Sequence, residues 1–360
     1  MAQHQGKAKP PITVSSRITL LRDGMRSAVK RYSADLLHGR PGALHPRIVA
    51  AAQPRQPGET VKHFAEEWEA LPSAPGLSGV AWLGHCSVLL KLGGKTILTD
   101  PVLSHKIGVK VGPIMVGPRR LAPTIPAEAL PPVDLIVISH AHFDHLDKPT
   151  LRALVSKRTV VVTSSKTGHL IPRGFDDVLE LEWFSELTVG GLHLRTLRPA
   201  HWGARNAWDR HRGYNSYIFS GRAAGESGLA AGAAGGAGAQ QDRAGASAPY
   251  PECRVLFAGD TAYTEAYRDA GPIDLAVFGI GAYNPWEHAH ATPEQALAMA
   301  TQAGAKMLLP VHHSTFKLSD EPPHEPMTRL QSAAKSAREA RGETPRIIEA
   351  AVGDIVGFGK

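Results

Sequence analysis

The chain has 360 residues, of which 42% are hydrophobic, 20% are charged and two are cysteines. This length and apolar content allow a sizeable core and exclude a disordered chain, while two cysteines exclude a disulfide framework and indicate a reducing compartment. The formal net charge is +7, but residues 1–62 hold eleven Lys and Arg against three acids, which leaves 29 basic and 30 acidic residues for the rest. A remainder so close to neutral gives little attraction to a nucleic acid, and none is expected as a partner.

Residues 1–75 are expected to form a basic N-terminal extension that contains an amphipathic helix. Apolar residues recur at helical spacing over residues 16–36, and most basic residues of this stretch fall elsewhere on the helical wheel. Such a helix either packs on its own domain or lies on an anionic membrane surface, and Gly24 together with the modest apolar face favours packing.

The same extension bears on where the protein is found. It contains no apolar core of the kind that signal peptides have, and no eighteen apolar residues run together anywhere in the sequence. We therefore expect a cytoplasmic protein, with peripheral contact to the inner membrane surface through the basic helix as the alternative.

Residues 76–360 are expected to form one domain in which strands, loops and helices alternate. The first half begins with a hairpin turned by Gly93 and Gly94, because paired glycines tolerate positive φ. A buried strand, a helix, another strand and a second hairpin follow. These five elements occupy residues 79–100, 133–139, 146–155, 158–164 and 187–201.

The second half of the domain continues the alternation. Thr292 and Gln295 form a capping box that predicts the start of a helix. The other elements expected here are three strands and a C-terminal helix followed by a short strand, at residues 214–220, 253–260, 306–313, 327–341 and 345–354. Strands in two blocks, each finished by helices, predict sheets packed face to face with helices outside.

A segment rich in glycine and alanine, residues 221–249, interrupts this pattern. It contains no aromatic or β-branched residue and only one leucine, so it cannot bury enough surface to offset its chain entropy. We interpret it as a mobile insertion that joins two adjacent strands and has no catalytic role.

The sequence ISHAHFDHLD, residues 138–147, concentrates ionisable side chains at the end of a buried strand. Alternate residues leaving a strand can point the same way, so His140 and His142 can bind one cation through their imidazole nitrogens. The chain then turns, which lets Asp144 and His145 face a second cation beside the first. Zn²⁺ takes such a mixture of nitrogen and carboxylate ligands, and Fe and Mn also suit it.

Four ligands cannot fill two coordination shells, so this hypothesis requires further donors downstream. Three polar residues stand where later apolar runs end: His201, Asp260 and His312. Because packed sheets bring strand ends to a common edge, these three side chains are expected to converge on the first cluster. The sequence therefore predicts a centre for two divalent metal ions.

This constellation resembles the metallo-β-lactamase superfamily of hydrolases over residues 76–315. The resemblance implies an α/β (α+β) fold, namely a four-layer αβ/βα sandwich with two packed mixed β-sheets and outer helices. It implies that Asp260 bridges both metal ions. It also implies one set of three ligands for each ion: His140, His142 and His201 for the first, and Asp144, His145 and His312 for the second.

Further motifs narrow the resemblance to one branch. WLGHCS, LTDPVLS, VGPRRL, PAHW, GDTAY, IGAYNP, HATPEQA and VHHSTF are similar, in that order, to N-acyl-phosphatidylethanolamine-hydrolysing phospholipase D. Ascorbate-phosphate lactonases share the broader pattern, but the ordered string favours the phospholipase-D-like branch. The insertion at residues 221–249 is foreign to this pattern.

The expected activity is hydrolysis of phosphodiester bonds, in phospholipids of the N-acyl-phosphatidylethanolamine type or in smaller diesters. Two bridged cations lower the pKa of a shared water and provide the attacking hydroxide. Asp144, Asp260 and His290 are the candidate catalytic residues, with Asp144 as a proton acceptor and His290 on the substrate side. Two alternatives remain open: a lactonase or carboxylic-ester hydrolase on the same site, and a membrane-associated metal-binding protein without turnover.

The roles of four further residues stay open in the sequence. His85 either contacts the centre or lies hydrogen-bonded in the core, and Asp100 either orients a ligand or caps a turn before Pro101. Arg119 and Arg120 either meet a phosphate or form a solvated pair.

Overall fold

The computed structural model describes residues 57–73, 76–206, 209–221 and 253–358. They belong to one compact unit, Arg55–Lys360. The predicted helix within residues 16–36 lies outside the described residues, as does the predicted insertion except for Gly221, so neither interpretation is tested.

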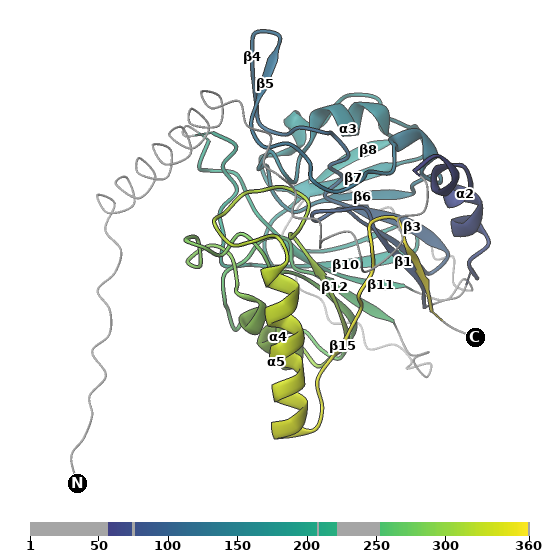
Figure 1. Cartoon of the computed structure of the whole chain (residues 1–360). Helices are drawn as coiled ribbons and strands as arrows, with labels where there is room; N and C mark the ends of the chain where they lie inside the picture. The colour runs from purple at the N-terminus through teal and green to yellow at the C-terminus, as the bar shows by residue number, and fades with distance from the viewer. Residues whose placement is uncertain (1–56, 74–75, 207–208, 222–252, 359–360) are drawn as a thin grey trace, which may run out of the picture. The chain divides into compact units, whose positions relative to one another are not determined.

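Two mixed sheets form the centre of this unit (Figure 1). The first has the order β16-β1-β2-β3-β6-β7-β8, with strands β1 (Leu77–Trp82), β2 (Val88–Leu92), β3 (Lys95–Thr99), β6 (Leu135–Ile138), β7 (Val160–Ser164), β8 (Asp177–Leu181) and β16 (Ile355–Gly357). The second has the order β15-β14-β13-β12-β11-β10-β9, with strands β9 (Glu186–Val189), β10 (Leu192–Leu197), β11 (Ser216–Gly221), β12 (Arg254–Phe257), β13 (Ile273–Gly279), β14 (Ala305–Val311) and β15 (Arg346–Ile347). Each sheet is part antiparallel and part parallel.

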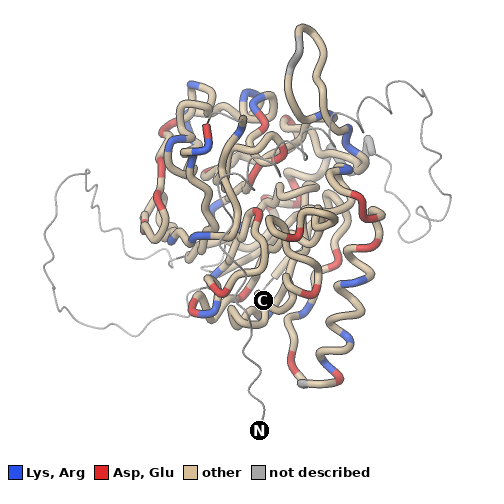
Figure 2. Tube along the Cα trace, turned by 90° about the vertical axis from the view of Figure 1, so that its left-hand side faces the viewer, with Lys and Arg blue, Asp and Glu red and all other residues tan. Residues whose placement is uncertain are grey.

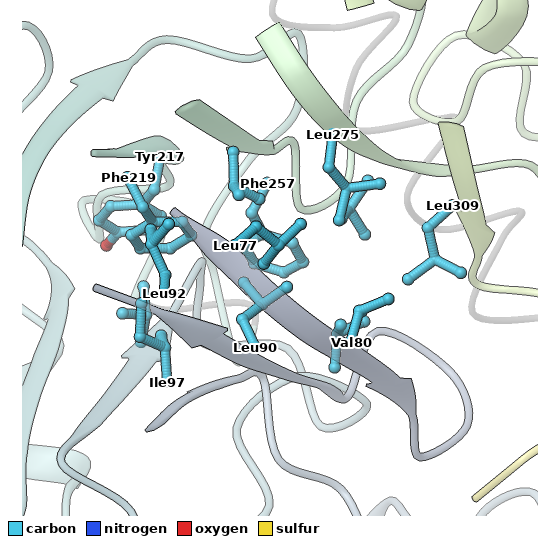
Figure 3. Close-up of a cluster of buried hydrophobic side chains, with 14 of the residues drawn as sticks. Leu77, Val80, Leu90, Leu92, Ile97, Tyr217, Phe219, Phe257, Leu275 and Leu309 are labelled. Carbon is cyan, nitrogen blue, oxygen red and sulfur yellow. The ribbon is translucent and has the colours of Figure 1, made fainter. Parts of the chain in front are cut away.

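The main core lies between the two sheets (Figure 3). Successive side chains of a strand point to opposite faces, and β2 shows the consequence. Leu90 and Leu92 pack against residues of the second sheet such as Phe219 and Phe257, whereas Leu89 lies in a separate cluster on the outer face. Strands buried on both faces explain why the sequence reads as continuous apolar runs rather than as an alternation.

Helices cover the outer face of each sheet. Helix α2 (Pro57–Glu69), with Phe64 and Trp68, packs in the cluster outside the first sheet, where α3 (Lys148–Ala153) contributes Leu151. Helices α4 (Pro293–Gln302) and α5 (Glu325–Arg341) cover the second sheet, with Leu330 buried against it. Two short 3-10 helices lie at Ala127–Ala129 and Gly168–Leu170. The predicted four-layer sandwich is confirmed.

Helix α2 falls inside the segment expected as an N-terminal extension. Phe64 and Trp68 are fully buried, and the Trp68 indole donates a hydrogen bond to Thr96 Oγ1 at 3.1 Å. This part of the segment is therefore packed into the core cluster of the domain. The division at residue 76 otherwise stays a prediction, because residues 1–56 lie outside the described residues.

The first predicted strand is broken in the structure. Residues 79–92 form not one strand but the end of β1 and all of β2, which pair antiparallel around a turn. Gly84 and His85 both have positive φ, at 95° and 54°. The turn is closed by Leu83 N–H donating to Ser87 O at 2.8 Å, and by the Trp82 indole donating to His85 O at 2.8 Å. The break presents His85 at the end of the sheet.

A two-stranded ribbon stands apart from both sheets. Strands β4 (Val109–Val111) and β5 (Ile114–Val116) pair only with each other and project beyond the rest of the unit at the top of Figure 1. Elsewhere basic and acidic residues are interspersed along the described chain (Figure 2), as the near-neutral composition predicts. Among the described residues, no helix has the length and apolar character needed to cross a bilayer.

Candidate metal centre

The seven predicted ligands come from four loops that follow strands β6, β10, β12 and β14. The loop after β6 carries four of them, and the other three strands each deliver one: His201, Asp260 and His312. The structure brings all seven together in two groups that share Asp260. Within each group the candidate ligand atoms lie within 4.8 Å of one another.

The first group contains three histidines and the shared carboxylate. His142 Nδ1 lies 2.7 Å from His140 Nε2 and 3.3 Å from His201 Nε2. Asp260 Oδ2 lies 3.8 Å from His140 Nε2 and 3.6 Å from His201 Nε2. Four donor atoms thus surround one point, in the number that a tetrahedral cation takes.

The second group contains Asp144, His145 and His312 around the same carboxylate. His145 Nε2 lies 3.1 Å from Asp260 Oδ2, and His312 Nε2 lies 3.3 Å from Asp260 Oδ1. Asp144 Oδ2 is 3.7 Å from His145 Nε2 and 3.5 Å from His312 Nε2. Asp260 Oδ2 therefore lies close to nitrogens of both groups, which suits a carboxylate shared between them.

Several of these atoms are buried without a hydrogen-bond partner. Among the described residues, they include His145 Nε2, Asp260 Oδ1 and His312 Nε2. Buried polar atoms in folded proteins are nearly always satisfied, and leaving them so costs free energy. A divalent cation in the second group would satisfy all three, so the donor set fits a metal ion.

The two ligand groups differ in the pKa values of their histidines. Burial lowers the pKa of His142 to about 4 and holds the pKa values of His140 and His201 well below the usual range, so these three imidazoles are neutral and ready to bind a cation. Burial also opposes charge on His145 and His312, but the nearby carboxylates outweigh it. They raise the pKa of His312 to about 9 and that of His145 well above its usual range.

The two carboxylates of the centre stay ionised. Burial opposes ionisation of Asp144 and Asp260, yet the positive charge of His145 holds the pKa of both well below the usual range. In the metal-free chain, protons on His145 and His312 therefore balance the two carboxylates. A metal ion would replace those protons as the positive charge of this group.

Asp100 orients one of the ligands. Its Oδ2 lies 2.6 Å from His145 Nδ1, and its Oδ1 accepts a hydrogen bond from Ser139 N–H at 2.7 Å. With Nδ1 held in this way, His145 Nε2 is directed at Asp260. Such carboxylate–histidine pairs fix the ring orientation and basicity of metal ligands. Of the two readings left open for Asp100, the geometry favours the orienting one.

His201 is oriented by the loop between β13 and α4. Its Nδ1 lies 3.0 Å from the carbonyl oxygen of Ala289, the residue before His290. This contact leaves Nε2 as the nitrogen that faces the centre, 3.6 Å from Asp260 Oδ2. The ring stacks on Trp202, with centroids 4.5 Å apart and an interplanar angle of 24°.

His85 lies at the centre rather than in the general core. Its Nε2 is 3.1 Å from Asp144 Oδ2, and its side chain is almost completely buried. Burial lowers the pKa of His85 to about 3, so the neutral ring donates a hydrogen bond from Nε2–H to the Asp144 carboxylate. The His85 backbone carbonyl accepts from His312 N–H at 3.1 Å. One residue therefore braces two members of the second group.

His290 stands on the open side of the centre. Its Nδ1 is 3.8 Å from Asp260 Oδ2, and its side chain keeps 15% of its surface exposed, more than the 2% of Asp260. Burial lowers the pKa of His290 to about 4. Trp202, which is 40% exposed, stands beside His142 with ring centroids 5.2 Å apart. These two partly exposed side chains therefore lie beside the ligand groups on the same side of the centre as solvent.

Other residues considered from the sequence lie elsewhere. The Arg120 guanidinium is bound to backbone carbonyls, at 2.8 Å for Val102 and 3.1 Å for Pro123, and also to Leu83 O. It is neither a phosphate contact nor part of a solvated pair, whereas Arg119 is exposed.

Two residues near the centre carried no signal in the sequence. Arg205 Nη1 donates to the carbonyl oxygens of Ala141 at 2.9 Å and Leu146 at 2.8 Å, and thereby ties down the loop that carries four ligands. The Cys86 thiol lies within 4.8 Å of ligand atoms of the second group. Burial and the neighbouring Asp260 raise the pKa of Cys86, which keeps the thiol protonated.

Comparison with known proteins gives one family. The beta-lactamase superfamily domain matches residues 95–313. A solved structure of a metallo hydrolase from Ignicoccus hospitalis superposes with a TM-score of 0.52 at 17% identity, over 79% of this chain and 99% of that one. At this identity, the likeness shows a shared fold.

The relatives that are similar in sequence include the following two proteins. An uncharacterized protein of Mycobacterium tuberculosis is 34% identical over 269 residues, which are 71% of this chain and 64% of the relative. The mitochondrial N-acyl-phosphatidylethanolamine-hydrolyzing phospholipase D of Saccharomyces cerevisiae is 27% identical over 273 residues, which are 71% of this chain and 51% of the relative. The matched part thus spans less than two thirds of either relative.

Proposed function

This chain belongs to the beta-lactamase superfamily of metal-dependent hydrolases, and we propose that it uses two divalent metal ions to hydrolyse phosphodiester bonds. One observation carries the proposal: two sets of buried or half-buried ligand residues share the carboxylate of Asp260. Zinc is the proposed metal, because three nitrogens with a carboxylate suit it, and Fe or Mn are the alternatives. When bound, a metal pair lowers the pKa of a shared water and neutralises charge on the attacking and leaving oxygens.

The side chains of this centre have separate tasks in the proposed reaction. Asp144 is ionised and lies at the edge of the second group, so its carboxylate can accept a proton from the attacking water. His290 is neutral at pH 7 because of its low pKa, so it contributes a hydrogen bond to a substrate oxygen and not a positive charge. Asp260 belongs to both ligand groups and so fixes the position of one group relative to the other.

The substrate class rests on relatedness and on charge. The yeast relative is named for hydrolysis of N-acyl-phosphatidylethanolamine, a phosphodiester, and the ordered motifs of this chain resemble that branch. A nearly neutral domain disfavours a polyanion such as RNA as the substrate. We therefore propose a phospholipid of this type or a smaller diester, acted on by a cytoplasmic protein.

The second candidate is a lactonase or carboxylic-ester hydrolase on the same centre. Both reactions need an attacking hydroxide, and the ligand groups alone do not separate them. The third, a metal-binding protein held at a membrane by residues 1–75 without turnover, would use the same ligands for a structural purpose.

Side-by-side rates distinguish these candidates. With the zinc-loaded full chain, we expect kcat/KM for bis(p-nitrophenyl) phosphate to exceed that for a simple lactone by about tenfold or more. The reverse ratio would assign the centre to ester or lactone hydrolysis. Turnover of neither substrate, nor of an N-acylated phosphatidylethanolamine, with metal bound would favour the non-catalytic protein.

A further inference from the structure

The β4–β5 ribbon exposes an apolar face. Val109 pairs with Val116 and Val111 with Ile114, so Val109, Ile114 and Val116 lie on one face of the ribbon. Their exposed fractions are 51%, 63% and 41%. Large exposed hydrophobic side chains gathered on one projecting element mark an interaction surface more often than a packing accident.

The sequence around the ribbon is basic. Residues 101–127 contain no Asp or Glu, but they contain Lys106, Lys110, Arg119 and Arg120. Lys106 and Arg119 face each other in an isolated bridge at the foot of the ribbon, and Arg119 is exposed. Figure 2 shows no acidic residue on the projecting tube. Within residues 101–127, the charged residues that accompany the apolar face are therefore basic alone, and Arg119 is the exposed one at its foot.

The foot of the ribbon is firmly fixed. Arg120 N–H donates to His105 O at 2.8 Å, and Leu121 N–H donates to Thr315 O at 2.7 Å. Gly108 and Gly117 face each other where the ribbon leaves its foot, and a Cβ on either would collide with the backbone opposite. The ribbon therefore projects from a foot that backbone hydrogen bonds hold in place, and its apolar side chains stay exposed.

This base adjoins the metal centre. Ile107 packs with Val102 and Phe316 in a small separate cluster. The Phe316 ring lies 5.4 Å from the ring of His85, whose Nε2 is 3.1 Å from Asp144 Oδ2. One chain of contacts thus leads from the foot of the ribbon to the second ligand group.

We propose that the β4–β5 ribbon docks this domain on an anionic lipid surface. Apolar side chains that insert at the boundary between headgroups and acyl chains, next to basic residues that attract anionic headgroups, are the two contributions that hold peripheral proteins on membranes. The docking itself stands on the ribbon alone. Its role, which is to bring the metal centre to a lipid diester, rests on the proposed function.

Vesicle flotation of the full chain tests the docking. We expect the wild type to float with vesicles of phosphatidylcholine and phosphatidylserine, and Ile114→Asp to lower the partition coefficient about tenfold or more. Phe184→Asp is the matched control, because Phe184 is 67% exposed but lies outside the ribbon. Equal loss in both variants, or none in Ile114→Asp, would overturn the proposal.

A local probe separates the ribbon from residues 1–75, for which membrane contact was the alternative expectation. In Ile114→Trp, the added indole should shift its emission to the blue when these vesicles are added, relative to the wild type under the same conditions. An unchanged spectrum in a chain that still floats would assign membrane binding to another segment. A dimer in vesicle-free solution that Ile114→Asp dissolves would assign the ribbon to self-association instead.

Two further measurements test the contribution of basic residues to docking and the independence of docking from catalysis. Arg119→Glu should weaken binding to vesicles with phosphatidylserine more than to pure phosphatidylcholine, and high salt should remove that difference. Ile114→Asp should keep the metal content of the wild type and its rate on bis(p-nitrophenyl) phosphate, a soluble diester. Loss of docking with that rate intact supports the ribbon, whereas an inactive wild type that still docks contradicts only the proposed function.

Discussion

His142→Ala is expected to lower kcat/KM for bis(p-nitrophenyl) phosphate by about 10³-fold or more in the presence of excess Zn²⁺. His142 Nδ1 is the middle of the first ligand group, 2.7 Å from His140 Nε2 and 3.3 Å from His201 Nε2. Its removal leaves two nitrogens and a shared carboxylate for that cation. The measurement is steady-state kinetics of the two purified proteins.

The control for this variant is His288→Ala. His288 is exposed and belongs to neither ligand group, so its loss should change the rate less than about twofold. Circular dichroism and the melting temperature of His142→Ala establish that it is folded. A folded His142→Ala variant that retains most of its activity would contradict the assignment of the first ligand group.

Mild acid should release the metal of the second group long before that of the first. In the metal-free chain, His145 and His312 carry protons at pH 7, because their pKa values are raised, that of His312 to about 9. A metal ion must displace both protons. Its affinity should therefore fall as the pH falls, by about tenfold per displaced proton and about a hundredfold per pH unit for the two.

The first group should behave differently over the same range. Burial lowers the pKa of His142 to about 4 and holds those of His140 and His201 well below the usual range, so no proton competes there near neutral pH. Elemental analysis after dialysis between about pH 8 and about pH 6 should show the content fall from two ions to one. Simultaneous loss of both ions, or loss of neither, would contradict this separation of the two groups.

Much of the fold could be predicted from the sequence, because local patterns determine it. Apolar runs that end in polar residues predicted the strands, and the capping box at Thr292 and Gln295 forms as expected, with a hydrogen bond in each direction. The broken strand at Gly84 and His85 was missed. A turn between two apolar segments of similar composition changes neither hydrophobicity nor periodicity, and only the paired glycine and histidine conformations reveal it.

The ligands were predictable for a related reason. Each of the four loops follows a buried strand, and strand ends meet at one edge of a sandwich. His201, Asp260 and His312 could therefore be grouped from the sequence, and they lie together in the structure. Their supports could be predicted only in part, since the sequence left the role of Asp100 open and gave no sign of Arg205. Asp100 reaches His145 across 45 residues of sequence, and Arg205 reaches Ala141 across 64, through contacts that depend on tertiary packing alone.

The substrate is harder to predict from the sequence than the type of reaction is. Folds of this kind carry unrelated activities, so function depends on what surrounds the ligands. In this chain the ligands are surrounded by His290 and Trp202, which are partly exposed, and the foot of the β4–β5 ribbon lies close by. The ribbon carries an exposed apolar face with basic residues beside it. A phospholipid diester at an anionic surface is the substrate that we propose, because it would give all three a purpose.

The most direct test of a two-metal phosphodiesterase is a titration of the metal-stripped chain with Zn²⁺ during turnover of bis(p-nitrophenyl) phosphate. The rate should rise until about two equivalents of Zn²⁺ are bound per chain and then stay constant. A rate that saturates at one equivalent would contradict a centre that needs both ligand groups. A chain that binds two equivalents and hydrolyses no diester would contradict the proposed reaction itself.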